Sequence, residues 1–158
     1  MPAPKGKILS IAIASGKIGY VFLIDNMLMD WGLSVRASKT PGLAKCKAQE
    51  WIDFYRPDIV VVEKTAKYSR KSIRTHSLIE AVANLCTDRK QQFIAIERQQ
   101  TYPNKYDEMD ALCLQFPQIS GWMPDKRQPW DAETNDAIYF EALSMAVTLI
   151  EPPVNLPV

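Results

Sequence analysis

The sequence predicts an α/β fold in which a mixed five-stranded sheet carries helices on both of its faces. Three apolar runs rich in β-branched residues follow one another within the first 35 positions, separated by short turns. After position 40, helical and strand patterns alternate, as they do when helices connect successive strands. The 158 residues, 47% apolar and 23% charged, suit a single globular domain over 1–158.

The first three strands are expected over residues 7–14, 18–25 and 27–35. Gly16 lies in the first connection and Asn26 in the second, and both residue types favour tight turns. Connections this short join antiparallel neighbours, so these three strands should form a meander.

The rest of the chain reads as αβαβ followed by closing helices. A helix opens at Thr40-Pro41-Gly42 and stops before Pro57, and the next strand ends on Glu63. The later elements are expected as a helix over 73–88, a strand over 92–97, a helix over 103–116, a loop over 120–129 and a long helix over 132–150. The proline-rich residues 151–158 cannot continue that helix and should form a tail.

Composition excludes several classes of protein. No apolar run approaches the ~20 residues that a membrane helix needs, and the first residues are too few and too polar for a signal peptide. We therefore expect a cytoplasmic protein, associated with the nucleoid, or one of an organelle matrix. The three cysteines, Cys46, Cys86 and Cys113, are too far apart for a disulfide framework or a zinc site, and they are interpreted as core residues.

A basic segment follows the strand that ends on Glu63. Residues 64–74 contain no Asp or Glu but have five cations and one aromatic residue: Lys64, Lys67, Tyr68, Arg70, Lys71 and Arg74. A solvated surface is the commonest meaning of such a run. The net charge of +1 predicts no nucleic acid partner, but clustered cations with an aromatic residue that can stack on a base favour contact with nucleic acid here.

Three carboxylates suggest a metal site. Glu63 ends a buried strand, and Glu133 and Asp136 lie three residues apart and so share one face of the last predicted helix. Acidic residues in a first helical turn are also ordinary capping residues. If the three carboxylates converge in the folded chain, however, they could bind one or two Mg²⁺ ions for phosphodiester cleavage. Glu97 also ends a strand, but the adjacent Arg98 can pair with it, so Glu63 is preferred.

The order of these motifs resembles the RuvC-like nucleases of the RNase H superfamily. The matching pieces are Ile8 to Ala14 with Gly19-Tyr20, then the apolar strand into Glu63, then Glu133-x-x-Asp136-Ala137. The resemblance covers nearly the whole chain and implies an RNase H-like fold. In that family the first strand carries an aspartate seven residues before Gly-Tyr, and this sequence has Ala12 at that position.

The resemblance implies a metal-dependent endonuclease on branched DNA, with two Mg²⁺ or Mn²⁺ ions held by the residues corresponding to position 12, Glu63, Glu133 and Asp136. It also implies a homodimer that cuts four-way (Holliday) junctions symmetrically. The loop after Glu63, around Lys67, Tyr68 and Arg70, would then enter the junction centre, and Lys105 would lie near the DNA backbone.

Ala12 leaves two readings open. Without the first-strand carboxylate, a two-ion site loses a central ligand, so cleavage should fall by orders of magnitude. Either the chain is a naturally non-catalytic protein that binds branched nucleic acid, or an active nuclease was altered at this position. The close fit of the neighbouring residues favours the second reading. A structural or kinase-like member of the same broad fold is a third possibility, and it predicts no salt-dependent affinity for DNA.

Overall fold

The computed structural model of the chain describes residues 6–64, 73–97, 105–123 and 137–150. Within these ranges the strands are β1 (Lys7–Ala14), β2 (Lys17–Ile24), β3 (Met27–Ser34), β4 (Ile59–Glu63) and β5 (Phe93–Ile96). The α-helices there are α1 (Pro41–Tyr55), α2 (Ile73–Asp88), α3 (Lys105–Gln115) and α4 (Ala137–Ile150). Two short 3₁₀ helices, η1 (Arg36–Ser38) and η2 (Pro117–Trp122), complete the described elements. The predicted order of strands and α-helices is confirmed.

Some element bounds differ from the predicted ones. β2 begins at Lys17, so this residue belongs to the sheet and not to the turn before it. β5 covers only 93–96. Residues 117–122 form η2, which includes part of the predicted loop, because Pro117 supplies the fixed φ that suits the first position of a helix. The predicted helix starts at 103 and 132, and the tail over 151–158, lie outside the described residues.

The sheet has the strand order β3-β2-β1-β4-β5. β1 pairs with β2, and β2 with β3, in antiparallel fashion, whereas β4 is parallel to both β1 and β5. The turn between β2 and β3 works because Asp25 and Asn26 both adopt positive φ, 50° and 69°, which these residue types tolerate in tight hairpins. The predicted mixed five-stranded α/β sheet is therefore confirmed.

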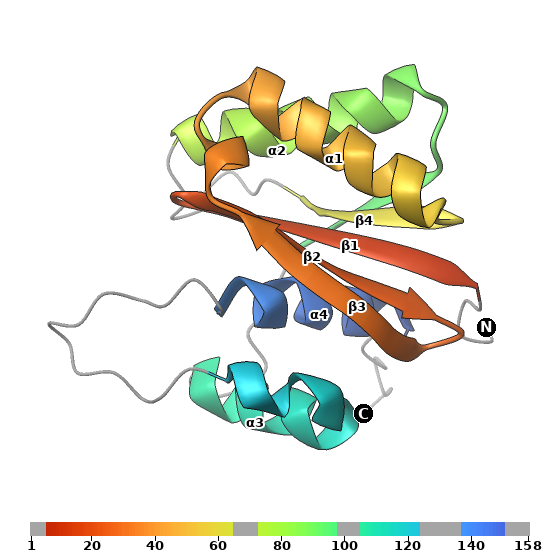
Figure 1. Ribbon diagram of the computed structural model, residues 1–158, viewed down its shortest axis with the longest axis vertical. Helices are drawn as coiled ribbons and strands as arrows, with labels where there is room; N and C mark the ends of the chain where they lie inside the picture. Colours follow the sequence, from red (N-terminus) through yellow and green to blue (C-terminus); the bar gives the residue numbers. More distant parts are fainter. Residues whose placement is uncertain (1–5, 65–72, 98–104, 124–136, 151–158) are drawn as a thin grey trace, which may run out of the picture.

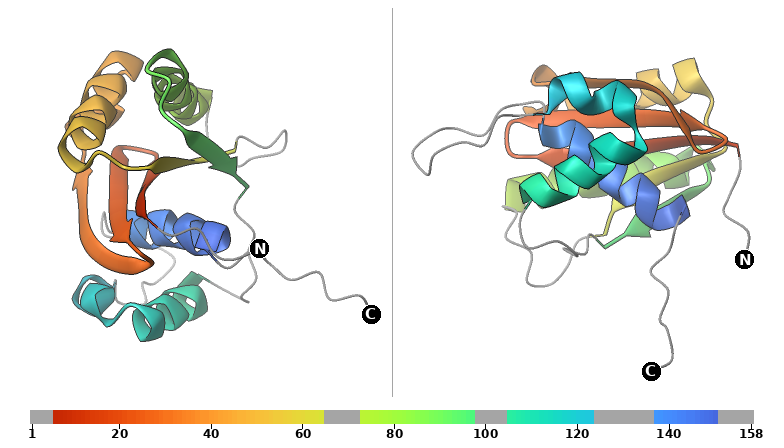
Figure 2. Two further views of the ribbon diagram at one scale, coloured as in Figure 1. Left: turned by 90° about the vertical axis from the view of Figure 1, so that its right-hand side faces the viewer. Right: turned by 90° about the horizontal axis from the view of Figure 1, so that it is seen from below.

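Alternate residues of the central strand face two separate cores, one on each side of the sheet. Leu9 and Ile11 point to the face covered by α1 and α2, and Ile8 and Ala12 point to the face covered by α4. Figure 1 shows the sheet between these two helical layers, and Figure 2 shows α3 beside α4 in the lower layer. Helices on both faces explain why most of β1 and β2 is buried.

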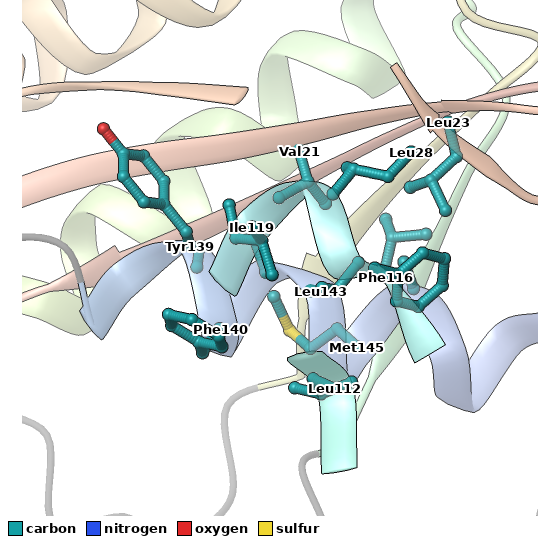
Figure 3. Packing of buried hydrophobic residues seen from close by; sticks show 14 of the residues in the cluster. Val21, Leu23, Leu28, Leu112, Phe116, Ile119, Tyr139, Phe140, Leu143 and Met145 are labelled. Atoms are coloured by element: carbon teal, nitrogen blue, oxygen red, sulfur yellow. The ribbon is translucent and has the colours of Figure 1, made fainter. Parts of the chain in front are cut away.

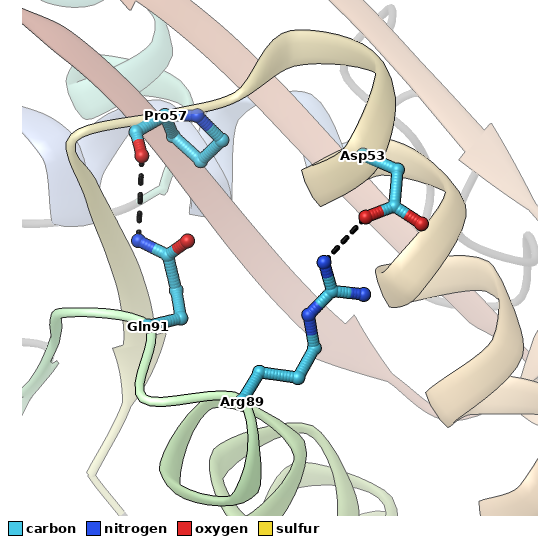
Figure 4. A network of polar contacts seen from close by, with 4 residues as sticks. All are labelled: Asp53, Pro57, Arg89 and Gln91. Atoms are coloured by element: carbon cyan, nitrogen blue, oxygen red, sulfur yellow. Dashed lines mark hydrogen bonds and ion pairs between the residues drawn. The ribbon is translucent and has the colours of Figure 1, made fainter.

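Polar contacts fix α1 against its neighbours. Thr40 caps the helix by accepting a hydrogen bond from the Leu43 backbone N–H at 3.1 Å, with Pro41 as the first helical residue. At the opposite end, Arg89 after α2 pairs with Asp53 of α1, and the Gln91 amide donates to the Pro57 carbonyl at 3.3 Å (Figure 4). These contacts join α1, α2 and the entry to β4.

Helix α4 packs closely on the sheet. The buried Ser10 hydroxyl of β1 donates a hydrogen bond of 2.6 Å to the Ala142 carbonyl, which ties the middle of the helix to the central strand. Figure 3 shows the apolar cluster that α4 shares with β2, β3, α3 and η2. Its labelled members include Val21, Leu23, Leu28, Leu112, Ile119, Phe140, Leu143 and Met145. This core sets the position of the helix relative to β1.

The cysteines are free thiols in different environments. Cys86 is buried, and burial raises the pKa of its thiol to about 11, against the opposing effect of the Arg89 charge. Cys113 is partly buried, but Cys46 is exposed on α1, so the expectation of a core role is wrong for Cys46. Among the described helices, none combines the length and the apolar character needed to cross a membrane.

Candidate metal centre and nucleic-acid interface

Position 12 and Glu63 lie toward the carboxyl ends of two neighbouring strands that pair in parallel over Ile8–Ser10 and Ile59–Val61. Ser10 of β1 pairs with Val61 of β4, and two residues further along each strand come Ala12 and Glu63. The ladder ends at Ser10 and Val61, and if its register continued, Ala12 and Glu63 would share a face about 4.8 Å apart. Because Ala12 belongs to the core under α4, Glu63 also points to the α4 side.

Burial at this pair is pronounced. Ala12 is 1% exposed, and Glu63 is half-buried with its Oε2 atom shielded from solvent. This end of the sheet therefore carries a buried methyl group at position 12 and a half-buried carboxylate at Glu63.

Gly19 brings the start of α4 to this pair. It sits opposite Ala12 in the β1–β2 ladder, and a Cβ atom on it would lie 2.6 Å from Cγ2 of Ile138. Only a glycine permits this approach, so the first turn of α4, with Ala137, packs in the same core as Ala12. In the sequence Asp136 immediately precedes Ala137, but Glu133 and Asp136 lie outside the described residues. Their convergence with Glu63 stays a prediction.

A buried lysine on the same face is a residue that the sequence reading missed. Lys17 pairs with Ala14, is only 7% exposed, and shares the side-chain direction of Gly19 and Val21 toward α4. The alternation of side-chain direction along β2 predicts this orientation once the strand is known to begin at Lys17, one residue earlier than predicted. Lys17 thus lies opposite Ala14 on β2, two strands away from Glu63 in the sheet.

The described residues do not by themselves form a metal site. Among them no group of three or more His, Cys, Asp or Glu side chains is arranged to hold an ion. Glu63 is the predicted ligand that falls within these ranges, and Ala12 offers no oxygen donor. Mg²⁺ needs several oxygen ligands, so binding depends on Glu133, Asp136 and water.

The two ends of the basic segment are fixed at the same edge of the sheet. The Lys64 backbone N–H donates to the Ile96 carbonyl at 2.8 Å, and the Arg74 guanidinium donates to the Lys39 carbonyl at 2.7 Å. Both side chains are exposed. Lys67, Tyr68, Arg70 and Lys71 lie outside the described residues, as does the side chain of Lys105 at the start of α3.

Tyr20, the second residue of the Gly-Tyr motif, lies on the opposite face from position 12. Its hydroxyl is hydrogen-bonded to that of Tyr55 at 2.6 Å, and Tyr55 donates in turn to the Asp30 carboxylate. A Cβ on Gly32 would lie 2.8 Å from the Tyr20 ring, so this glycine makes room for it. Burial raises the pKa of both phenols. The motif is therefore divided: Gly19 admits α4, and Tyr20 ties the sheet to α1.

Glu97, the alternative ligand, is placed less favourably than Glu63. Ile96 pairs with Glu63 and is buried in the core under α4, whereas Glu97 follows it and is exposed. Successive residues at a strand end alternate in direction, so Glu97 is not expected to face position 12. This geometry agrees with the preference for Glu63.

Comparison with known proteins gives matches in structure only. No protein-family model matches the chain, and no curated protein sequence matches it. The solved structure of Thermus thermophilus RuvC matches with a TM-score of 0.57 and 14% identity, over 90% of this chain and 92% of that one.

Two other similar structures come from a virus and from yeast. The fowlpox virus resolvase, solved with a substrate Holliday junction, has a TM-score of 0.60 and 17% identity, covering 92% of this chain and 99% of that one. The yeast mitochondrial Holliday junction resolvase Ydc2 has a TM-score of 0.62 and 12% identity, covering 95% of this chain and 81% of that one. At such identities the matches establish a shared fold, which is the RuvC-type RNase H-like fold predicted from the motifs.

Proposed function

We propose that this chain binds four-way DNA junctions with a resolvase-type scaffold, and that its hydrolytic site is impaired at Ala12. The observation that carries the proposal is that Ala12, packed in the core with the start of α4, and Glu63 lie toward the carboxyl ends of the neighbouring strands β1 and β4. The shared fold supports it, because the similar structures are junction resolvases and two of them are complexes with Holliday junctions.

Glu63, Glu133 and Asp136 are the residues that would hold Mg²⁺ or Mn²⁺. When two such ions are bound, they can activate a water molecule and stabilise the leaving oxygen in phosphodiester cleavage. With a methyl group at position 12, one oxygen ligand shared by such a site is missing. Junction cleavage by this chain is therefore slower by orders of magnitude than with a carboxylate there.

Lys17 acts on the DNA in this proposal. By the alternation of β2, Lys17 faces the α4 side opposite Ala14 of β1, and Glu63 lies on β4 at the other side of β1. A phosphate that approached this end of the sheet would meet the cation of Lys17 on β2 and the carboxylate of Glu63 on β4. Lys17 thus positions the DNA backbone, and it can do so whether or not the bond is cut.

The basic segment over 64–74 supplies the wider contact with branched DNA. Its ends at Lys64 and Arg74 lie at the edge of the sheet that carries Glu63. The cations between them, with Tyr68 for base stacking, are proposed to contact the junction centre. A homodimer would present two such edges to a symmetric junction.

The test is to restore the carboxylate. The Ala12→Asp variant should cut a four-way junction with Mg²⁺ at a rate orders of magnitude above that of the native chain, and should cut a linear duplex of the same sequence much less. The Ala12→Asn variant, of the same size but without charge, is the control.

The outcomes separate two functions. If Ala12→Asp binds junctions tightly yet never cuts them with Mg²⁺ or Mn²⁺, the nuclease reading fails and the chain is a non-catalytic binding protein. If neither form shows salt-dependent affinity for DNA, both functions fail and a structural member of the fold is the better description.

A further inference from the structure

A pocket of about 230 Å³ opens at the end of β1, on the side of the sheet that α1 and α2 cover. Three separate segments meet there: the turn Ser15-Gly16 between β1 and β2, the end of η1 with Lys39, and the first described turn of α2 with Arg74. No acidic residue of the described chain lines it. The pocket is therefore positively charged, with Lys39 and Arg74 at its rim.

The cation on α2 is held in place. Arg74 donates from one Nη atom to the Lys39 carbonyl at 2.7 Å, which fixes the guanidinium across the pocket wall and leaves its other N–H groups for a ligand. An arginine oriented by one hydrogen bond presents a planar set of donors that suits a phosphate. Lys39, which follows η1, contributes a second positive charge to the pocket.

The turn between β1 and β2 adds backbone donors. Within the described residues, the backbone N–H groups of Ser15 and Gly16 donate no hydrogen bond. Gly16 has φ of +83°, a left-handed conformation that glycine adopts without strain, and a Cβ there would meet nothing within 4 Å. The turn is thus open toward a ligand and offers two amides, both donors.

The inner wall is rigid. Ser38 is 5% exposed and Thr75 is 3% exposed, and the Ser38 hydroxyl donates to the Val35 carbonyl at 2.7 Å. Leu78 closes the floor from the core side. Because the polar groups at the floor of the pocket already have hydrogen-bond partners, the hydrogen-bond donors at the rim determine which ligand binds. These donors favour an anion.

We propose that this pocket binds a phosphate of the DNA backbone next to the proposed cleavage site. The proposal rests on the proposed function, and it adds a subsite outside the carboxylate region. Ala14 lines the pocket and lies two residues along β1 from Ala12, about 7 Å along the strand, with the pocket on the α1 and α2 side of the sheet and Ala12 on the α4 side. The lining contains no aromatic residue to stack on a base, so the ligand is the phosphate itself.

DNA is preferred over free phosphate because Arg74 is the last cation of the basic segment proposed to follow the junction. A DNA strand that contacts both Lys64 and Arg74 at this end of the sheet would pass the rim of the pocket. Amide NMR distinguishes the two sources: the Ser15 and Gly16 resonances should shift with a junction at micromolar concentration, and with inorganic phosphate only at millimolar concentration. Saturation by inorganic phosphate or a mononucleotide at micromolar concentration, without a shift from DNA, would overturn the DNA assignment.

A matched pair of variants tests the pocket in binding. Val35 lines the pocket and is 45% exposed, and Met27 is 61% exposed at the other end of β3. Val35→Glu places a carboxylate in the pocket and should weaken junction binding at least tenfold, whereas Met27→Glu makes the same charge change far from it and should leave binding within about twofold. Unchanged melting temperatures show that both variants fold.

Neutralising the rim gives a second measurement. Arg74→Gln should weaken junction binding about tenfold and reduce the slope of log K against log salt by about 0.9, the value for one phosphate contact. Lys7→Gln removes one charge at the opposite end of β1 and should leave the slope unchanged. If Val35→Glu and Met27→Glu both bind the junction with the affinity of the native chain, the proposed role of the pocket is overturned. The proposed function would then remain intact.

Discussion

Replacing Ala12 with aspartate should make the stability of this protein depend on divalent cations. The new carboxylate would enter a site that is 1% exposed, and a continued register of β1 and β4 would put it about 5 Å from Glu63. Two unit charges about 5 Å apart repel by roughly 3 kcal/mol at the effective dielectric of about 20 that suits protein sites. The variant should therefore be less stable than the native chain when no metal is present.

The expected change is large enough to measure by thermal unfolding. At about 2–4 °C per kcal/mol for a chain of this size, roughly 3 kcal/mol lowers Tm by about 6–12 °C in EDTA. Mg²⁺ or Mn²⁺ at 100 times its Kd returns about 2.7 kcal/mol, most of the loss. The assay is differential scanning fluorimetry of the native chain, Ala12→Asp and Ala12→Asn with and without metal.

The pattern across the three proteins decides the outcome. Ala12→Asp should gain much more Tm from metal than the native chain, and Ala12→Asn should follow the native chain. If Ala12→Asp melts at one temperature in EDTA and in Mn²⁺, position 12 does not complete a metal site and the geometric reasoning is refuted.

Four further predictions concern individual side chains. Lys17→Met should lower junction affinity about tenfold while keeping or raising Tm, measured by anisotropy and calorimetry, because a buried cation costs stability in the free protein. Gly19→Ala should destabilise the fold by about 1–3 kcal/mol in urea unfolding, since its Cβ would lie 2.6 Å from Ile138, and a native-like midpoint would refute that clash. Burial and hydrogen bonding raise the pKa of Tyr55 above 10, so the stability that this phenol contributes is fully present below pH 10 and is lost as the pH rises further. Tyr55→Phe should therefore make Tm fall less steeply with pH above 10. Cys86, with its raised pKa and buried position, should resist iodoacetamide at pH 8 while Cys46 reacts, as mass spectrometry would show.

The sheet could be predicted from sequence because each strand carries a local signal. The β-branched runs over β1 and β2, the turn residues Gly16 and Asn26, and the apolar run into Glu63 each specify an element by short-range chemistry. The element order then restricts the topology to a few arrangements. The bound at Lys17 was wrong because a lysine beside a glycine turn reads as part of the turn until its pairing with Ala14 is known.

The site was predictable only where a motif marks it. Glu63 and position 12 are marked by their strands, and the pairing of β1 with β4 places these strands next to each other. Lys17 and the pocket at Ser15-Gly16 and Arg74 depend on contacts between segments far apart in the sequence, which no local pattern reveals. Likewise, the need for a glycine at position 19 follows from Ile138, more than a hundred residues later.

The role of the Gly-Tyr motif also became clear only from packing. The sequence indicates where the motif stands relative to position 12, but not that its two residues serve opposite faces. Gly19 sets the approach of α4 to the candidate metal centre, and Tyr20 joins β2 to α1 through Tyr55. Substitutions at the two positions should therefore affect different layers of the protein.

The most direct test of the central claim is the affinity of the native chain for a four-way junction compared with a linear duplex of the same arm sequence. Fluorescence anisotropy at two salt concentrations gives both affinities and their salt dependence. A resolvase-type binding protein should prefer the junction at least tenfold, with affinity that falls as salt rises. Equal affinity for the two DNAs, or no salt-dependent binding to either, would contradict the account.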